Sequence, residues 1–167
     1  MSGLESLVAY EDSDPIDIAE TLAEYYEWQF ERLSEEQIEM VIEAGWKNYS
    51  VSLEWSFNDE NLRLSSSFEM NPPDESIQRL YHTLNLVNSR CWSGFFLFLN
   101  SEKLMSFRSN LNLSEGFFAS TNQVNNLLKN AIMSCEKFYP AFQLAAWGGK
   151  DPDLAIDVVF EHAMGSA

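Results

Sequence analysis

Basic residues are scarce in this chain: its 167 residues include 10 Lys and Arg but 26 Asp and Glu, for a formal net charge of −16. Residues 1–75 hold 19 of the acidic residues and only three basic ones, Arg32, Lys47 and Arg63, whereas residues 76–167 hold seven of each. One part of the chain is therefore strongly acidic. Such a charge excludes nucleic acid and anionic membrane surfaces as partners, and it permits a basic or hydrophobic protein partner.

Cysteine and histidine are also rare, with two of each. Cys91 and Cys135 are predicted to be free thiols on buried helix faces, because a disulfide framework needs more cysteines and a secreted context. Neither His82 nor His162 has a recognisable catalytic partner in the sequence, and the metal-ligand spacings CxxC and HExxH are absent. We therefore expect no catalytic residues, no metal and no cofactor.

Long hydrophobic runs are missing as well. The longest, residues 95–99, covers five positions, whereas a helix that crosses a bilayer needs about 20. The first residues lack the basic start and apolar stretch of a secretory signal. We therefore expect a cytoplasmic protein without membrane association.

The hydrophobic pattern predicts a single α+β domain over residues 14–167, after an acidic segment, 1–13, that we expect to be flexible. Asp14 and Pro15 favour the start of a helix. Three or four short strands follow, and those over about 49–55 and 62–70 form a hairpin. A helix over about 77–91, a second hairpin over 95–113, a helix from Ser120 and a last helix from Pro152 complete the order.

Three local predictions are sharper. Residues 95–99 are apolar at every position, which predicts a central strand buried on both faces. Pro140 is predicted to kink or end the helix that starts at Ser120, and Gly148 and Gly149 to stop the turns that follow. Glu54 and Glu69 are predicted to face each other across the polar side of the first hairpin.

The segment over residues 138–149 crowds aromatic side chains around a proline, and it has two interpretations. In one, these side chains are part of the core. In the other, Phe138, Tyr139, Phe142 and Trp147 leave an exposed apolar surface that binds a partner or a second copy of the chain. We predict these four as partner-binding residues, and in particular that Trp147→Ala weakens binding without unfolding the domain.

Three groups of residues form a recognisable combination. The most specific group spans 138–152 and comprises Phe138, Tyr139, Pro140, Ala141, Phe142, Trp147, Gly148, Gly149, Lys150 and Pro152. Two weaker groups comprise Trp28, Phe30, Arg32 and Leu33, and Asn88, Arg90, Trp92, Gly94 and Phe95. Together they resemble the YbjN-domain family, whose members are described as bacterial sensory transduction regulators. The resemblance covers roughly residues 20–165.

The resemblance implies a fold similar to class I type III secretion chaperones: a twisted antiparallel sheet packed by helices, in the order α-β-β-β-α-β-β-α. The hydrophobic pattern agrees with this order, with a possible fourth early strand and an extra C-terminal helix. Those chaperones are small, acidic homodimers that hold an unfolded segment of a partner. The resemblance brings no catalytic residues.

Our first functional hypothesis is a non-enzymatic, homodimeric protein-binding module with a chaperone-like or regulatory adaptor role. An extended partner would add a strand to a sheet edge or occupy a hydrophobic groove. The alternative is a small-molecule enzyme or sensor, which would need a deep pocket with converging polar groups. A third reading is an acidic decoy for a basic, nucleic-acid-binding surface on another protein.

Overall fold

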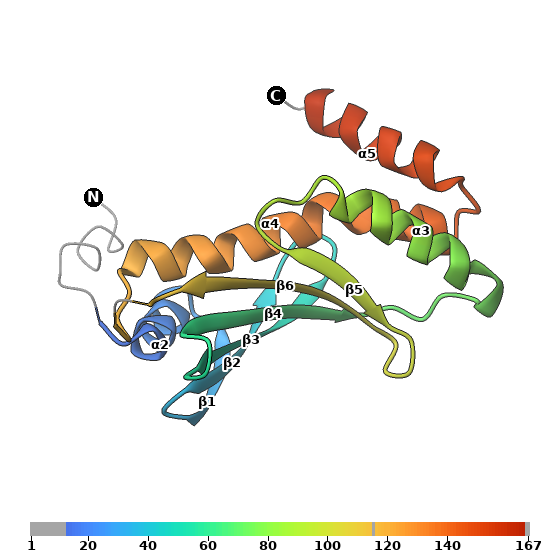
Figure 1. The fold of residues 1–167 in the computed structure, drawn as a ribbon. Helices are drawn as coiled ribbons and strands as arrows, with labels where there is room; N and C mark the ends of the chain where they lie inside the picture. Colours follow the sequence, from blue (N-terminus) through green and yellow to red (C-terminus); the bar gives the residue numbers. More distant parts are fainter. Residues whose placement is uncertain (1–12, 115, 166–167) are drawn as a thin grey trace.

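The computed structural model describes residues 13–114 and 116–165, with side chains described as far as Glu161. Residues 1–12 of the predicted segment 1–13 thus lie outside the described residues, as does the side chain of His162. Ser13 forms an isolated antiparallel bridge with Ala119. The predicted α+β order with an additional C-terminal helix is confirmed (Figure 1). The elements are α2 (Pro15–Tyr25), β1 (Gln29–Ser34), β2 (Gln37–Glu43), β3 (Asn48–Ser56), β4 (Asn61–Glu69), η1 (Asp74–Ser76), α3 (Ile77–Asn88), β5 (Phe95–Leu99), β6 (Leu104–Asn112), α4 (Thr121–Ala146) and α5 (Pro152–Gly165).

The six strands form one antiparallel sheet in the order β1-β2-β3-β4-β6-β5. The prediction that residues 95–99 form a central strand is wrong, because β5 is an edge strand. Phe96 and Phe98 are buried under the helices, whereas Phe95 on the other side is 48% exposed. Helix α3 covers one side of β5, and this packing, not a central position in the sheet, accounts for the buried apolar residues of the run.

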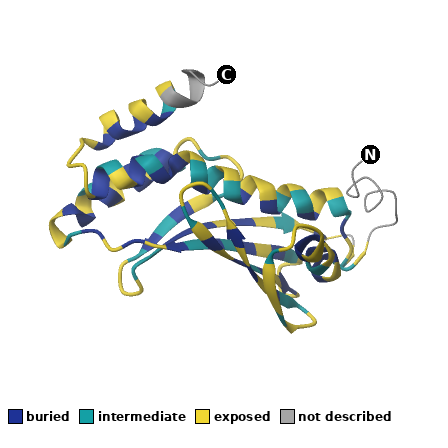
Figure 2. Ribbon diagram, turned by 180° about the vertical axis from the view of Figure 1, so that it is seen from behind, coloured by how far each residue is buried: buried dark blue, intermediate teal, exposed yellow. Residues whose placement is uncertain are grey.

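The described helices all lie on one face of the twisted sheet (Figure 1). Helix α4 packs on β4 and β6, α2 packs on β1–β3, and α3 packs on β5. Helix α5 packs in turn on α3 and α4, above the sheet. Because side chains alternate along a strand, every second residue over most of β2, β3 and β4 enters the core between sheet and helices, and Figure 2 shows the resulting buried and exposed stripes.

Helix α4 runs without interruption from Thr121 to Ala146, so Pro140 does not end it. A proline inside a helix costs about 3 kcal/mol because it removes one hydrogen bond and crowds the preceding turn. Here Phe138 and Phe142, on either side of the proline, are buried, and burial of each such ring contributes about 1.5–3 kcal/mol. Packing therefore offsets the cost. The predicted ends are confirmed: Ser120 and Gln123 form a capping box, and Gly149 has a positive φ of 64°.

Glu136 of α4 ties the helix to the turn between β2 and β3. Its carboxylate accepts hydrogen bonds from the backbone N–H groups of Gly45 and Trp46, and from the Tyr49 hydroxyl at 2.6 Å. Burial, followed by the hydrogen bond to Glu136, raises the pKa of Tyr49, so its hydroxyl remains a donor. One carboxylate thus fixes the position of the β2–β3 turn against α4.

We predict that Glu136→Ala lowers the free energy of unfolding by about 2 kcal/mol, because it removes hydrogen bonds to a charged acceptor. Urea denaturation followed by circular dichroism measures this loss. Glu24→Ala, at an exposed position of α2, is the matched control and should change stability by less than about 0.5 kcal/mol. Equal losses in the two variants would contradict the anchoring role of Glu136.

Candidate binding surface

The face of the sheet turned away from the helices carries small polar side chains. We call it the open face; its central members alternate with core residues along the strands and are Val41, Ser50, Ser52, Ser65, Ser67 and Ser106. The strand register places Val41, Ser50, Ser67 and Ser106 in one row across β2, β3, β4 and β6. No helix covers this row in the part of the chain that the structure describes.

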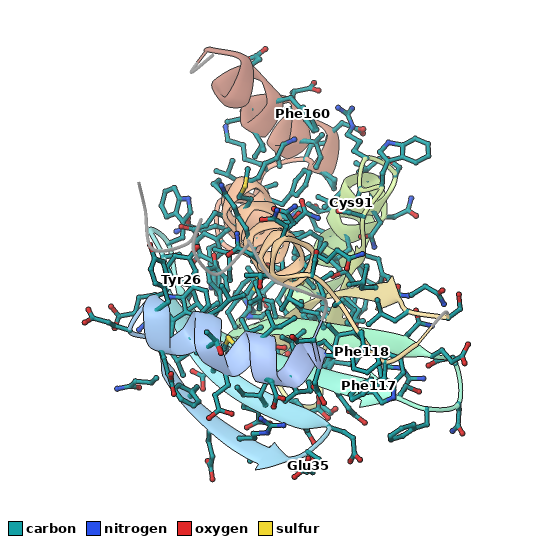
Figure 3. All side chains as sticks on the ribbon, turned by 90° about the vertical axis from the view of Figure 1, so that its left-hand side faces the viewer. Tyr26, Glu35, Cys91, Phe117, Phe118 and Phe160 are labelled. Carbon is teal, nitrogen blue, oxygen red and sulfur yellow. The ribbon has the colours of Figure 1, made fainter. Side chains whose placement is uncertain are left out.

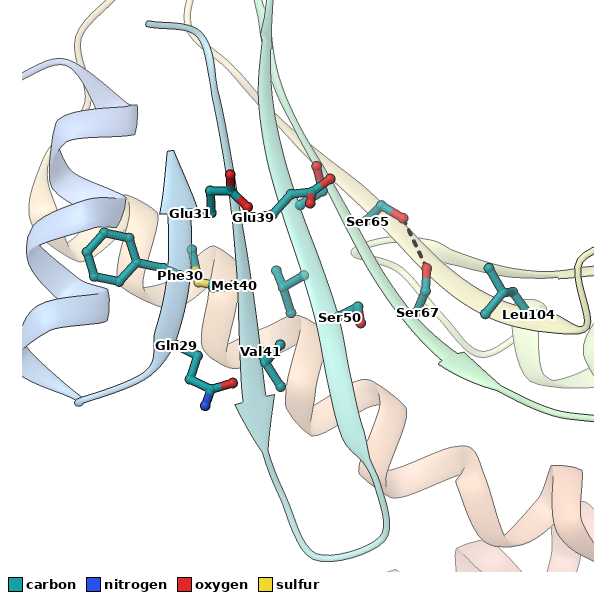
Figure 4. Close-up of a pocket in the computed structure, with 12 residues that line it drawn as sticks. Gln29, Phe30, Glu31, Glu39, Met40, Val41, Ser50, Ser65, Ser67 and Leu104 are labelled. Carbon is teal, nitrogen blue, oxygen red and sulfur yellow. Dashed lines mark hydrogen bonds between the residues drawn. The ribbon is translucent and has the colours of Figure 1, made fainter. Parts of the chain in front are cut away.

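The open face is hollowed by two adjoining cavities. One, of about 500 Å³, spans β1–β4 and reaches Leu104 of β6 (Figure 4). The other, of about 710 Å³, extends towards the β2–β3 turn at Trp46 and Lys47. The two share Ser50, Ser67 and Leu104, and we call the combined hollow the groove.

Serine side chains form the floor of the groove, and their small size keeps it open. The Ser106 hydroxyl lies 3.0 Å from that of Ser65 and 3.1 Å from that of Ser67, and Ser106 is 1% exposed. Ser65 and Ser67 line the groove above the buried Ser106, so their hydroxyls can exchange hydrogen bonds with a polar ligand or a peptide backbone. Acyl-transfer chemistry at a serine needs a base, and the described histidine, His82, lies on α3 on the other side of the sheet.

Acidic side chains form the wall of the groove at β1 and β2. Glu31 lies directly opposite Glu39 in the strand register, and Figure 4 shows the two side by side. Arg32, the next residue of β1, points to the helix side, where it binds Asp17 at 2.6 Å and Glu20 at 2.9 Å. These two hydrogen bonds, Asp17 first, raise the pKa of Arg32. Arg32 of β1 therefore forms its ion pairs with α2, on the side of the sheet away from the groove.

The profile of the YbjN family, described as "Putative bacterial sensory transduction regulator", matches residues 15–144. The chain belongs to this family. The residues from Trp147 to Pro152, on which part of the predicted resemblance rested, lie beyond the matched range.

Two solved structures are similar to this YbjN-family chain. The crystal structure of YbjN from E. coli, described as a putative transcription regulator, has a TM-score of 0.51 and 10% sequence identity, over 71% of this chain and 84% of that one. The HopA1–SchA chaperone–effector complex has a TM-score of 0.46 and 15% identity, over 77% and 87% of the two chains. No curated protein matches. Likeness at this identity concerns the fold alone.

The structure separates the four predicted partner-binding residues of this YbjN-family chain. Phe138, Tyr139 and Phe142 are buried, so of the two interpretations of residues 138–149 the core interpretation holds for these three, and the exposed apolar surface does not. Their rings pack against strand residues: the ring centroids of Phe142 and Phe96 are 5.1 Å apart, and those of Tyr139 and Phe68 are 5.6 Å apart. Trp147, at the C-cap of α4, is 49% exposed and stays a predicted contact residue.

The groove itself was missed in the sequence. The available signal was serine at alternate positions of neighbouring strands, which marks a face that is neither core nor highly charged. The predicted opposition of Glu54 and Glu69 is wrong, because Glu54 pairs with Arg63 and Glu69 pairs with Leu104 of β6. The pair Glu31 and Glu39 could not be found, since the turn at residues 35–36 sets their register.

The two cysteines differ in their surroundings, although both are free. Cys135 is buried under the sheet, and burial raises its pKa to about 12, so its thiol stays protonated at neutral pH. Cys91, predicted to be buried, is only half-buried and follows the end of α3; burial raises its pKa too. A protonated thiol is a poor nucleophile. Figure 3 shows Cys91 on the helix side of the molecule, near α3.

Among the described residues, no group of three or more His, Cys, Asp or Glu side chains could hold a metal ion. None of the helices in the described part of the chain is both long enough and apolar enough to span a bilayer.

The different environments of Phe142 and Trp147 predict different losses of stability. Phe142→Ala leaves a core cavity and should lower the free energy of unfolding by about 3–5 kcal/mol. Trp147→Ala should change it by no more than about 0.5 kcal/mol, because half of the side chain is in solvent. Urea denaturation of the two variants measures both values. A large loss for Trp147→Ala would show that this residue belongs to the core.

Proposed function

We propose that this YbjN-family chain is a non-enzymatic protein-binding module with a chaperone-like or regulatory adaptor role in the cytoplasm. The observation that carries the proposal is the groove on the open face. The core that stabilises the domain lies on the other face, under the helices. A partner can therefore bind the open face without disturbing the core. Its floor of hydroxyl groups and its apolar margin at Val41 and Leu104 suit an extended polypeptide.

The form of the groove favours a polypeptide over a small molecule. Pockets for small molecules enclose most of the ligand and line it mainly with apolar groups. Here the hollow does not enclose a ligand but crosses several strands on an exposed sheet face, and serine and glutamate make up half of the residues that line its part over β1–β4. Edge strand β1 borders it, with Phe30 and Leu33 exposed, so a partner segment has both a face and an edge to contact.

Site-specific crosslinking in living cells tests the proposal. A photoreactive phenylalanine analogue at Ser50, on the floor of the groove and exposed, should crosslink a protein partner. The same analogue at Gln78, exposed on α3, is the matched control and should give no adduct. Failure to crosslink from Ser50 and from a second groove position, Ser67, would contradict binding in the groove.

The proposal includes a homodimer, as the chaperone-like resemblance implies, and places its contact at β5. Trp92, in the loop before β5, is 97% exposed, and Phe95 at the start of the strand is also exposed. A fully exposed tryptophan beside an edge strand is costly for a monomer and typical of a protein contact. Two β5 edges that pair would bury both rings.

We expect sedimentation velocity of the wild-type chain to show a dimer. Trp92→Ala should shift it to a monomer without lowering the melting temperature, because the side chain has almost no contacts within its own chain. Phe118→Ala, which truncates an exposed aromatic ring far from β5 in sequence, is the control and should stay dimeric. A wild-type monomer at high concentration would contradict the dimer.

A further inference from the structure

We propose that the groove selects a basic segment of the partner protein, with a lysine or arginine side chain between Glu31 and Glu39. This inference rests on the proposed function, because it names the chemistry of the segment that the open face binds. It is carried by three features of the described residues: the opposition of two carboxylates, the commitment of nearby cations elsewhere, and the spacing of charged and apolar groups along β2.

The opposition of Glu31 and Glu39 is unfavourable in the free protein. Residues directly opposite on neighbouring antiparallel strands are close enough to interact, and like charges there destabilise the pair. Both side chains are exposed and line the groove. A cation placed between them removes the repulsion and adds two charge-assisted hydrogen bonds. The site is thus more favourable occupied than empty.

None of the three basic residues of the acidic half pairs with Glu31 or Glu39. Arg32 binds Asp17 and Glu20 on the helix side, and Arg63 binds Asp59 at 2.6 Å. The ammonium group of Lys47 lies over the ring of Tyr139, 5.8 Å from its centre. Within the described part of the chain, neither Glu31 nor Glu39 has an ion pair.

Arg108 is a further cation among the described residues of this face. It lies in the same cross-strand row as Glu39, beyond Ser52 and Ser65. Three strand spacings separate the two, about 14 Å, which exceeds the screening length of about 8 Å at physiological salt. Arg108 therefore leaves the charge of the wall uncompensated, and a cation must come from the partner.

The groove also sets the pattern of the segment. Val41 follows Glu39 by two residues on the same face of β2, so an extended segment that runs along this strand meets a carboxylate and then an apolar group. Its own side chains alternate with the same period. The matching segment has a basic residue two positions from an apolar one, and Ser50 and Ser52 on β3 face its backbone.

Fluorescence anisotropy with the full-length chain tests this specificity. The probe is a labelled short peptide in which arginine and valine alternate at every second position with threonine between them; the comparison peptide has glutamate in place of arginine. The arginine peptide should bind and the glutamate peptide should not. Binding should weaken as salt rises.

Two double variants of equal net charge separate a specific site from general attraction. Glu31→Gln with Glu39→Gln should weaken the arginine peptide about fivefold or more and should raise the melting temperature, because the repulsion is removed. Glu102→Gln with Glu161→Gln, at exposed positions outside the groove, should change affinity less than twofold. Equal weakening in both double variants, or in neither, would overturn the inference. Equal affinity for spermidine and for the peptide would also overturn it, in favour of a polyamine site.

The crosslinking experiment distinguishes failure of this inference from failure of the proposed function. If the analogue at Ser50 crosslinks a partner equally well with Glu31 and Glu39 replaced by glutamine, the groove binds protein and the charge specificity is wrong. If the wild-type background gives no adduct either, the binding function itself fails. Loss of the adduct only in the glutamine background supports both.

Discussion

The packing of α4 against one face of the sheet is the interaction on which the rest of this structure depends. Its apolar side covers β4 and β6 and meets α2, and its later turns support α3 and α5. Phe138 and Phe142 fill the space between helix and strands, and Glu136 fixes the β2–β3 turn. Because this packing lies on one side only, the opposite face of the sheet stays uncovered by helices and is available for binding.

The composition of the two faces follows from that asymmetry. Strand residues that meet the helices are large and apolar, such as Tyr49, Leu53 and Phe107. Residues on the open face are small and polar at the centre and acidic towards β1, so the open face contributes little to the core. The domain therefore need not change its own fold when a partner binds to the open face. The opposed Glu31 and Glu39 reduce stability at this face, which is common where function competes with folding.

Much of the fold could be predicted because local signals agree with the final packing. Asp14 caps α2 as expected, the strands around residues 57–60 form the predicted hairpin, and the Ser120 capping box starts α4. Predictions that needed tertiary information were wrong. The apolar run 95–99 gave no sign that β5 lies at an edge, and the expectation that Pro140 could end its helix ignored the burial of its neighbours. The groove depends on the register of four strands, which no single segment of sequence defines.

A crystal structure of this chain with the partner captured by crosslinking would test the central claim most directly. Our account predicts an extended segment of the partner along the open face, in contact with Val41, Ser50 and Ser67, with a basic side chain between Glu31 and Glu39. A partner bound on α3 and α5, with the groove empty, would contradict it.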